Sequence, residues 1–197
     1  MAYQVRRIRD YYPNCVYYDG QSPEYADPVM GSGALNCSFI AALSAVAWTS
    51  QGRLYIERSA TAGNCIVRFT TAAGANDPYE TSEELCFDTA LNPVFKCAYS
   101  SEWPGVQEVW PGLYEKAYAA RYLNLGACAC DQQGVWPGNA DPPLTRLCGC
   151  AVRQVALDIN TIRGLCAGND PAKKTKYPMV ISTKTSLEFA NQNLLIS

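Results

Sequence analysis

The feature that most constrains this chain is a short, strongly apolar segment in its first third. In GALNCSFIAALSAVAWTSQG, the residues Phe39, Ile40, Leu43, Val46 and Ala47 recur at three- and four-residue spacing, which predicts a helix. The opposite face carries small residues, so we expect the helix to be buried on most sides. Its apolar run of about ten residues is well short of the roughly twenty that cross a bilayer. The segment therefore predicts a buried core helix and no membrane partner.

The start of this helix holds a cysteine in a position that favours nucleophilic chemistry. Asn36 is a good helix N-cap, and Cys37 occupies the first helical position after a Gly-containing turn. The unpaired amides and positive pole of a helix N-terminus favour a thiolate and lower the cysteine pKa. The same amides can donate hydrogen bonds to an oxyanion. Cys37 is therefore the candidate catalytic residue.

The remaining chain alternates between strand-like and helical patterns. Residues 1–35 predict extended chain and turns, because they are rich in Tyr, Pro, Gly and Asp. Four runs between residues 53 and 99 predict a small antiparallel sheet or a set of hairpins: RLYIERS, NCIVRFTT, ELCFDTA and PVFKCAY. A second helix is predicted in VWPGLYEKAYAARYLNLG, with Pro111 in its first turn.

The last third combines a Cys-rich stretch with two further elements. Residues 127–149 predict a loop, and apolar spacing predicts a third helix between Val152 and Leu165. The run YPMVIST predicts one buried strand.

Two of these segments resemble the calpain-type cysteine proteases. The family's nucleophile motif has the form QGxLGxCWFLAAL, and residues 31–43 read GSGALNCSFIAAL. Its second motif, FWxxLLEKAYAKL, is similar to VWPGLYEKAYAARY at a comparable distance after the cysteine. The resemblance implies an α+β, two-lobed papain-like fold over roughly residues 28–190. Residues 1–149 would form the Cys-bearing subdomain, and residues 150–197 an incomplete start of the His/Asn-bearing one.

Three departures separate the chain from that family. Gly31 stands where the family has a glutamine that helps bind the oxyanion, and Ser38 stands where a tryptophan follows the cysteine. The third is the largest, because the 197 residues contain no histidine. Without an imidazole the thiol has no general base and the leaving amine no acid. We expect an inactive fragment of a thiol-dependent endopeptidase, whose parent protein supplies the histidine and asparagine.

The resemblance and its departures leave three functions open. The first is a calpain-like cysteine endopeptidase domain that acts on polypeptide substrates. The second is a non-catalytic, protease-like interaction module, and the third is a zinc-stabilised Cys-rich scaffold. The side chains of Glu115 and Lys116 in EKAYA predict a solvated helix face rather than chemistry.

The ten cysteines favour a reduced, cytoplasmic protein, because no export signal precedes them and Cys65, Cys86 and Cys97 lie in apolar runs. Two CxC pairs offer a weaker zinc site, with free thiols or disulfides as the alternatives; they are Cys128, Cys130, Cys148 and Cys150. Asp27 and Glu115 are a weak case for calcium, which takes six to eight oxygens. No cofactor is otherwise expected.

The charge balance argues against nucleic acid as a partner. Sixteen basic and eighteen acidic residues leave a net charge of -2, with no long run of either sign. A lobe that stops within a sheet would leave the strand near Met179 with an unpaired edge. We therefore expect self-association at high concentration.

Overall fold

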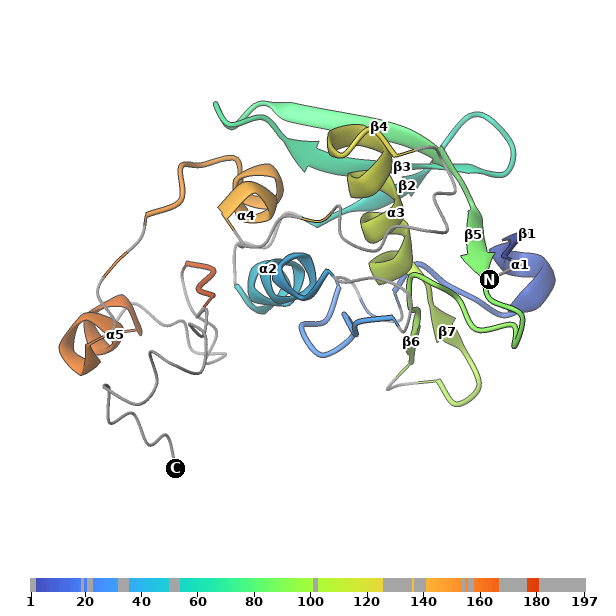
Figure 1. The fold of residues 1–197 in the computed structure, drawn as a ribbon, viewed down its shortest axis with the longest axis horizontal. Helices are drawn as coiled ribbons and strands as arrows, with labels where there is room; N and C mark the ends of the chain where they lie inside the picture. Colours follow the sequence, from blue (N-terminus) through green and yellow to red (C-terminus); the bar gives the residue numbers. More distant parts are fainter. Residues whose placement is uncertain are drawn as a thin grey trace.

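The chain folds into helices packed beside several small sheets. The computed structural model describes residues 3–18, 20, 23–31, 36–49, 54–100, 103–125, 136, 141–153, 155, 158–166 and 177–180. Its architecture is mixed α+β, and every paired strand of its sheets is antiparallel (Figure 1). This confirms the α+β class. Among the described residues, no helix combines the length and apolar character needed to cross a membrane.

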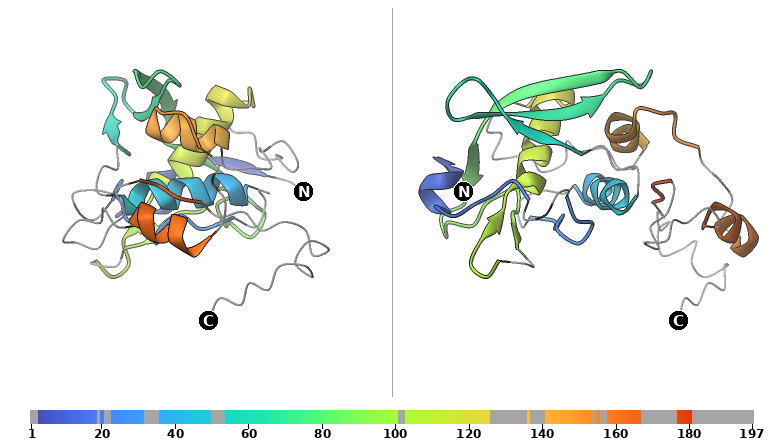
Figure 2. Two further views of the ribbon diagram at one scale, coloured as in Figure 1. Left: turned by 90° about the vertical axis from the view of Figure 1, so that its left-hand side faces the viewer. Right: turned by 180° about the vertical axis from the view of Figure 1, so that it is seen from behind.

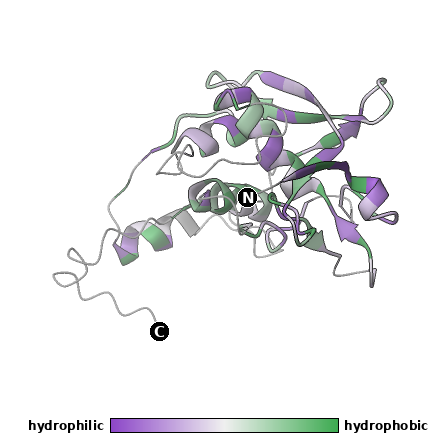
Figure 3. Cartoon of the chain, turned by 45° about the vertical axis from the view of Figure 1, so that its right-hand side comes forward, coloured by the Kyte–Doolittle hydropathy of each residue, from purple (hydrophilic) through white to green (hydrophobic). Residues whose placement is uncertain are grey.

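A three-stranded antiparallel sheet forms one layer, in the order β2, β3, β4. Its strands are β2 (Ile56–Arg58), β3 (Asn64–Thr70) and β4 (Asn76–Ser82). Hydrophilic and hydrophobic residues are interspersed along the long hairpin at the top of Figure 3. Cys65, Val67 and Phe69 on β3 are buried, as expected for a strand that covers a core on one face. The predicted runs RLYIERS and NCIVRFTT pair here as expected, whereas ELCFDTA and PVFKCAY contribute strands to separate two-stranded sheets. β4 was not predicted, because it is polar and contains Pro78, which only an edge strand tolerates.

The first residues form regular structure that the sequence did not indicate. β1 (Gln4–Arg7) pairs antiparallel with β5 (Glu84–Phe87), and the short helix α1 (Ile8–Tyr11) follows it. The expectation of only extended chain and turns is therefore wrong for residues 4–11. All four side chains of β1 are exposed, so the strand is held by backbone pairing and shows no apolar pattern. Another two-stranded sheet joins β6 (Ala98–Tyr99) to β7 (Gln107–Glu108).

Two predicted helices, α2 (Cys37–Trp48) and α3 (Trp110–Tyr122), lie in the interior. Both predictions are confirmed, and the proline of α3 lies in its first turn as expected. Aromatic rings connect α2, α3 and β3: Tyr118 lies 4.6 Å from Phe39 and 6.2 Å from Phe69, between ring centroids. Trp136 stacks on Tyr118 at 5.8 Å. These rings fix the position of α2 relative to α3.

The last third differs from its sequence prediction in two places. α4 (Asp141–Cys148) packs against α2 and β3, so the expected loop at 127–149 is wrong there (Figure 2). Prolines 142 and 143 indicated a loop, yet the first turn of a helix tolerates proline. α5 (Ile159–Cys166) confirms the third helix over part of its expected span. Residues 177–180 are not a strand, and the rest of YPMVIST lies outside the described residues. The predicted unpaired strand edge at Met179, from which self-association was expected, is therefore absent from the described residues.

Candidate functional site

Cys37 is the first residue of α2, and its thiol is exposed and free. The carbonyl oxygen of Asn36 accepts the first hydrogen bonds of the helix, from the N–H groups of Phe39 at 2.9 Å and Ile40 at 3.0 Å. Within the described part of the chain, the N–H of Cys37 has no acceptor. The predicted placement of the cysteine at a helix start is confirmed. One residue therefore offers both an accessible sulfur and a free backbone donor.

Asn36 does not cap α2 with its side chain, which corrects the N-cap expectation. The residue is fully buried, and its Nδ2 lies 2.5 Å from Oε2 of Glu115 in α3. Within the described residues, Oδ1 of Asn36 and Oε1 of Glu115 have no hydrogen-bond partner. The buried amide therefore ties the residue that precedes Cys37 to the neighbouring helix.

Glu115 and Lys116 are buried, with 0% and 2% of their surfaces exposed, so the expected solvated face is wrong. Burial raises the pKa of the Glu115 carboxyl well above its usual value, and the hydrogen bond to Asn36 opposes that rise. The Lys116 ammonium nitrogen donates to the Ser82 carbonyl at 2.7 Å, the Ser82 hydroxyl at 2.9 Å and the Glu84 carbonyl at 2.7 Å. Both charged side chains of the EKAYA motif are therefore internal anchors of α3.

Gly31, at the position of the family's glutamine, has no room for a side chain. A Cβ atom built on it would lie 2.0 Å from the carbonyl oxygen of Val94, far inside contact distance. The path of the backbone therefore excludes a side chain at this position. Ser38, at the position of the family's tryptophan, is half-buried.

The three cysteines that lie in apolar runs differ in their covalent state. Cys65 and Cys97 are free and buried, as predicted, and burial raises the pKa of both thiols, that of Cys65 to about 12. Cys86 is disulfide-bonded, which corrects its expected reduced state. An apolar run does not reveal whether the cysteine in it has a covalent partner.

The structure gives no support to a metal centre among the residues it describes, where no group of three or more potential ligands gathers. Cys148 and Cys150 are free thiols, whereas Cys128 and Cys130 lie outside the described residues. Asp27 accepts hydrogen bonds from Nε1 of Trp110 at 2.9 Å and from the backbone N–H of Glu24 at 3.2 Å. Neither of these partners is Glu115, the residue with which Asp27 was expected to hold a calcium ion.

Sequence reasoning missed two features: the contact between Asn36 and Glu115, and a cavity lined by Arg7, Arg9 and Arg58. The contact could have been suspected from the sequence, because Asn36 lies in the first family-like motif and Glu115 in the second. The arginines are dispersed along the chain, and only the fold gathers them. No family model, no curated protein and no solved structure matches this chain.

Proposed function

We propose that Cys37 is the nucleophile of a calpain-like cysteine endopeptidase with a papain-like, two-lobed fold. The observation that carries the proposal is the exposed, free thiol at the first position of a buried helix, beside a backbone N–H that has no acceptor among the described residues. The backbone N–H groups at a helix N-terminus can donate hydrogen bonds to an oxyanion that forms beside the thiol. Two motifs at the family's spacing, now in direct contact through Asn36 and Glu115, agree with it.

The proposed chemistry is acyl transfer to sulfur. The Cys37 thiolate attacks the carbonyl carbon of a polypeptide substrate, and the oxygen that becomes negative accepts a hydrogen bond from the Cys37 N–H. Collapse of this intermediate breaks the C–N bond and leaves an acyl-enzyme, while the departing amine takes up a proton. That proton needs an acid, and the sequence holds no histidine. The imidazole would come from a His/Asn-bearing segment outside this sequence, so the chain alone does not turn over.

Alkylation by iodoacetamide tests the proposal, with Cys150 as the matched internal control. Both thiols are exposed and free, but Cys150 follows a helix instead of starting one. We expect Cys37 to be labelled faster than Cys150 when the peptides are quantified by mass spectrometry over time. Equal labelling rates for the two thiols would contradict a helix-activated nucleophile.

A non-catalytic interaction module is the second candidate, and the crowding at Gly31 favours it. A domain that retains the fold without the glutamine or a histidine could bind polypeptides and leave them intact. A peptidyl chloromethyl ketone separates the two candidates. The hydrolase reading expects a covalent adduct at Cys37 that Cys37→Ser abolishes, whereas the module reading expects no selective adduct.

A further inference from the structure

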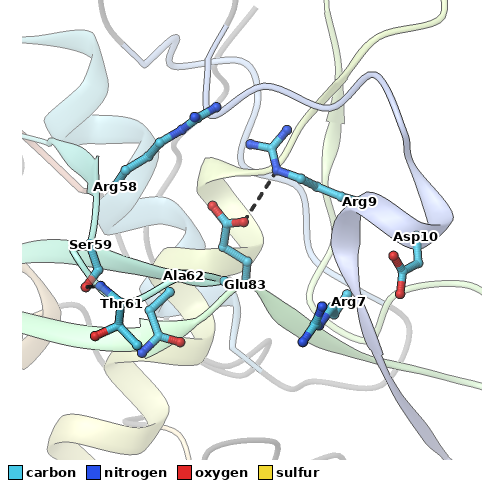
Figure 4. Close-up of a pocket in the computed structure, with 10 residues that line it drawn as sticks. Arg7, Arg9, Asp10, Arg58, Ser59, Thr61, Ala62 and Glu83 are labelled. Carbon is cyan, nitrogen blue, oxygen red and sulfur yellow. Dashed lines mark hydrogen bonds and ion pairs between the residues drawn. The ribbon is translucent and has the colours of Figure 1, made fainter.

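A cavity of about 560 Å³ lies between the N-terminal segment and the turn that joins β2 to β3 (Figure 4). It is lined by Arg7, Arg9, Asp10, Arg58, Ser59, Thr61, Ala62, Gly63, Asn64 and Glu83. None of these residues belongs to α2, and the cavity lies beside α1 and β1, on the side away from α4 and α5 (Figure 1). Its volume falls within the range of small-molecule sites.

One of its three arginines is already neutralised. Nε of Arg9 lies 3.4 Å from Oε2 of Glu83, and its Nη1 donates to the carbonyl of Cys15 at 3.3 Å. The other oxygen of Glu83 accepts the hydroxyl of Tyr17 at 2.5 Å. Figure 4 shows this pair between the other two arginines. The Arg9–Glu83 pair therefore forms a fixed wall with no net charge.

The remaining two arginines are Arg7 and Arg58. In the part of the chain that the structure describes, neither of their guanidinium groups has a hydrogen-bond or ion-pair partner. Asp10 is the other acid at the cavity and forms no ion pair there, so the lining carries three positive and two negative groups and is cationic overall.

The polar side chains of the nearby turn are engaged elsewhere. The Ser59 hydroxyl donates to Glu80 at 2.6 Å, and Nδ2 of Asn64 donates to the same carboxylate at 3.0 Å. The two guanidinium groups are therefore the strongest donors that the cavity offers to a ligand. Guanidinium groups present planar, forked donors that match carboxylate and phosphate oxygens.

We propose that this cavity binds an organic oxyanion, a small molecule whose phosphate or carboxylate oxygens accept hydrogen bonds from Arg7 or from Arg58, on the two sides of the Arg9–Glu83 pair. The cavity exceeds the size of a bare phosphate ion, so the anionic group would be attached to a larger organic body. The site is separate from Cys37, and its existence does not depend on the hydrolase proposal.

Isothermal titration of the full chain, with inorganic phosphate and acetate as separate probes at constant ionic strength, tests this site. We expect saturable binding of at least one probe, and the two arms distinguish a phosphate from a carboxylate ligand. Arg7→Gln or Arg58→Gln, whichever removes the arginine that holds the probe, should weaken that binding by about tenfold, since hydrogen bonds to charged groups contribute roughly 1.5–3 kcal/mol. Unchanged binding in both variants would contradict the proposal. Neither substitution removes a contact within the described protein, so both variants should unfold at the wild-type temperature without ligand.

Arg6→Gln is the matched control, because Arg6 is the next residue on β1, is equally exposed and lies outside the cavity. Its guanidinium is bonded to Gln4 instead. The control should keep wild-type affinity. No saturable binding of either probe, or an equal loss of affinity in Arg6→Gln, would overturn the proposal.

Discussion

Replacing Lys116 by Met tests directly whether the charged pair of the EKAYA segment is internal. The ammonium nitrogen makes three hydrogen bonds of 2.7–2.9 Å, two of them to the carbonyls of Ser82 and Glu84. Met has a similar shape but no donor, so the two carbonyls lose a buried partner. Each such loss costs about 1–3 kcal/mol. We therefore expect the free energy of unfolding to fall by about 4 kcal/mol, a large part of the roughly 5–15 kcal/mol of a typical domain.

Guanidinium chloride unfolding, followed by tryptophan fluorescence, measures this change as a shift in midpoint at constant slope. Lys96→Met is the matched control, because Lys96 is exposed and the same charge is removed there. An exposed substitution of this kind changes stability by about 0.5 kcal/mol or less. If both variants shifted the midpoint equally, Lys116 would be a solvated residue, and the internal anchor described above would be refuted.

Two further substitutions test the surroundings of Cys37. Glu115→Gln should remove a component of the pH dependence of the free energy of unfolding. The folded-state pKa of Glu115 is raised, so its carboxyl contributes fully to stability below the unfolded pKa of 4.5. That contribution is lost as the pH rises through the folded-state pKa. The stability of the variant relative to wild type should therefore increase with pH in urea titrations, and a constant difference would contradict the burial. Gly31→Ala should destabilise the chain by about 3 kcal/mol or more, because the new Cβ meets the Val94 carbonyl. Gly164→Ala, where nothing lies within 4 Å of the new Cβ, should be neutral or stabilising in the same thermal unfolding experiment; equal losses at both glycines would contradict the steric argument.

The sequence predicts those elements whose apolar pattern is local. α2 and the three strand-like runs at β2, β3 and β5 follow from spacing alone, and α3 follows from its aromatic face and first-turn proline. β1 and α4 could not be predicted in this way. All four residues of β1 are exposed, so it shows no apolar pattern, and the two prolines in the first turn of α4 favour a loop. The gathering of Arg7, Arg9 and Arg58 at the cavity depends on chain segments distant in sequence, and an apolar run gives no indication of the disulfide at Cys86.

The charged residues of α3 show why the neighbourhood of Cys37 could be predicted only in part. A Glu and a Lys on a helix ordinarily predict solvent, since isolated charges are costly to bury. Here ten successive residues from Trp110 to Ala119 are buried, so the helix has no solvated face along that length. Lys116 is satisfied by backbone carbonyls, and Glu115 lies against the amide of Asn36. The two motifs that resemble the calpain family are thus halves of one structural unit, in which the residue before the thiol is held by the second motif. A variant that breaks this contact should alter the reactivity of Cys37 without touching the sulfur.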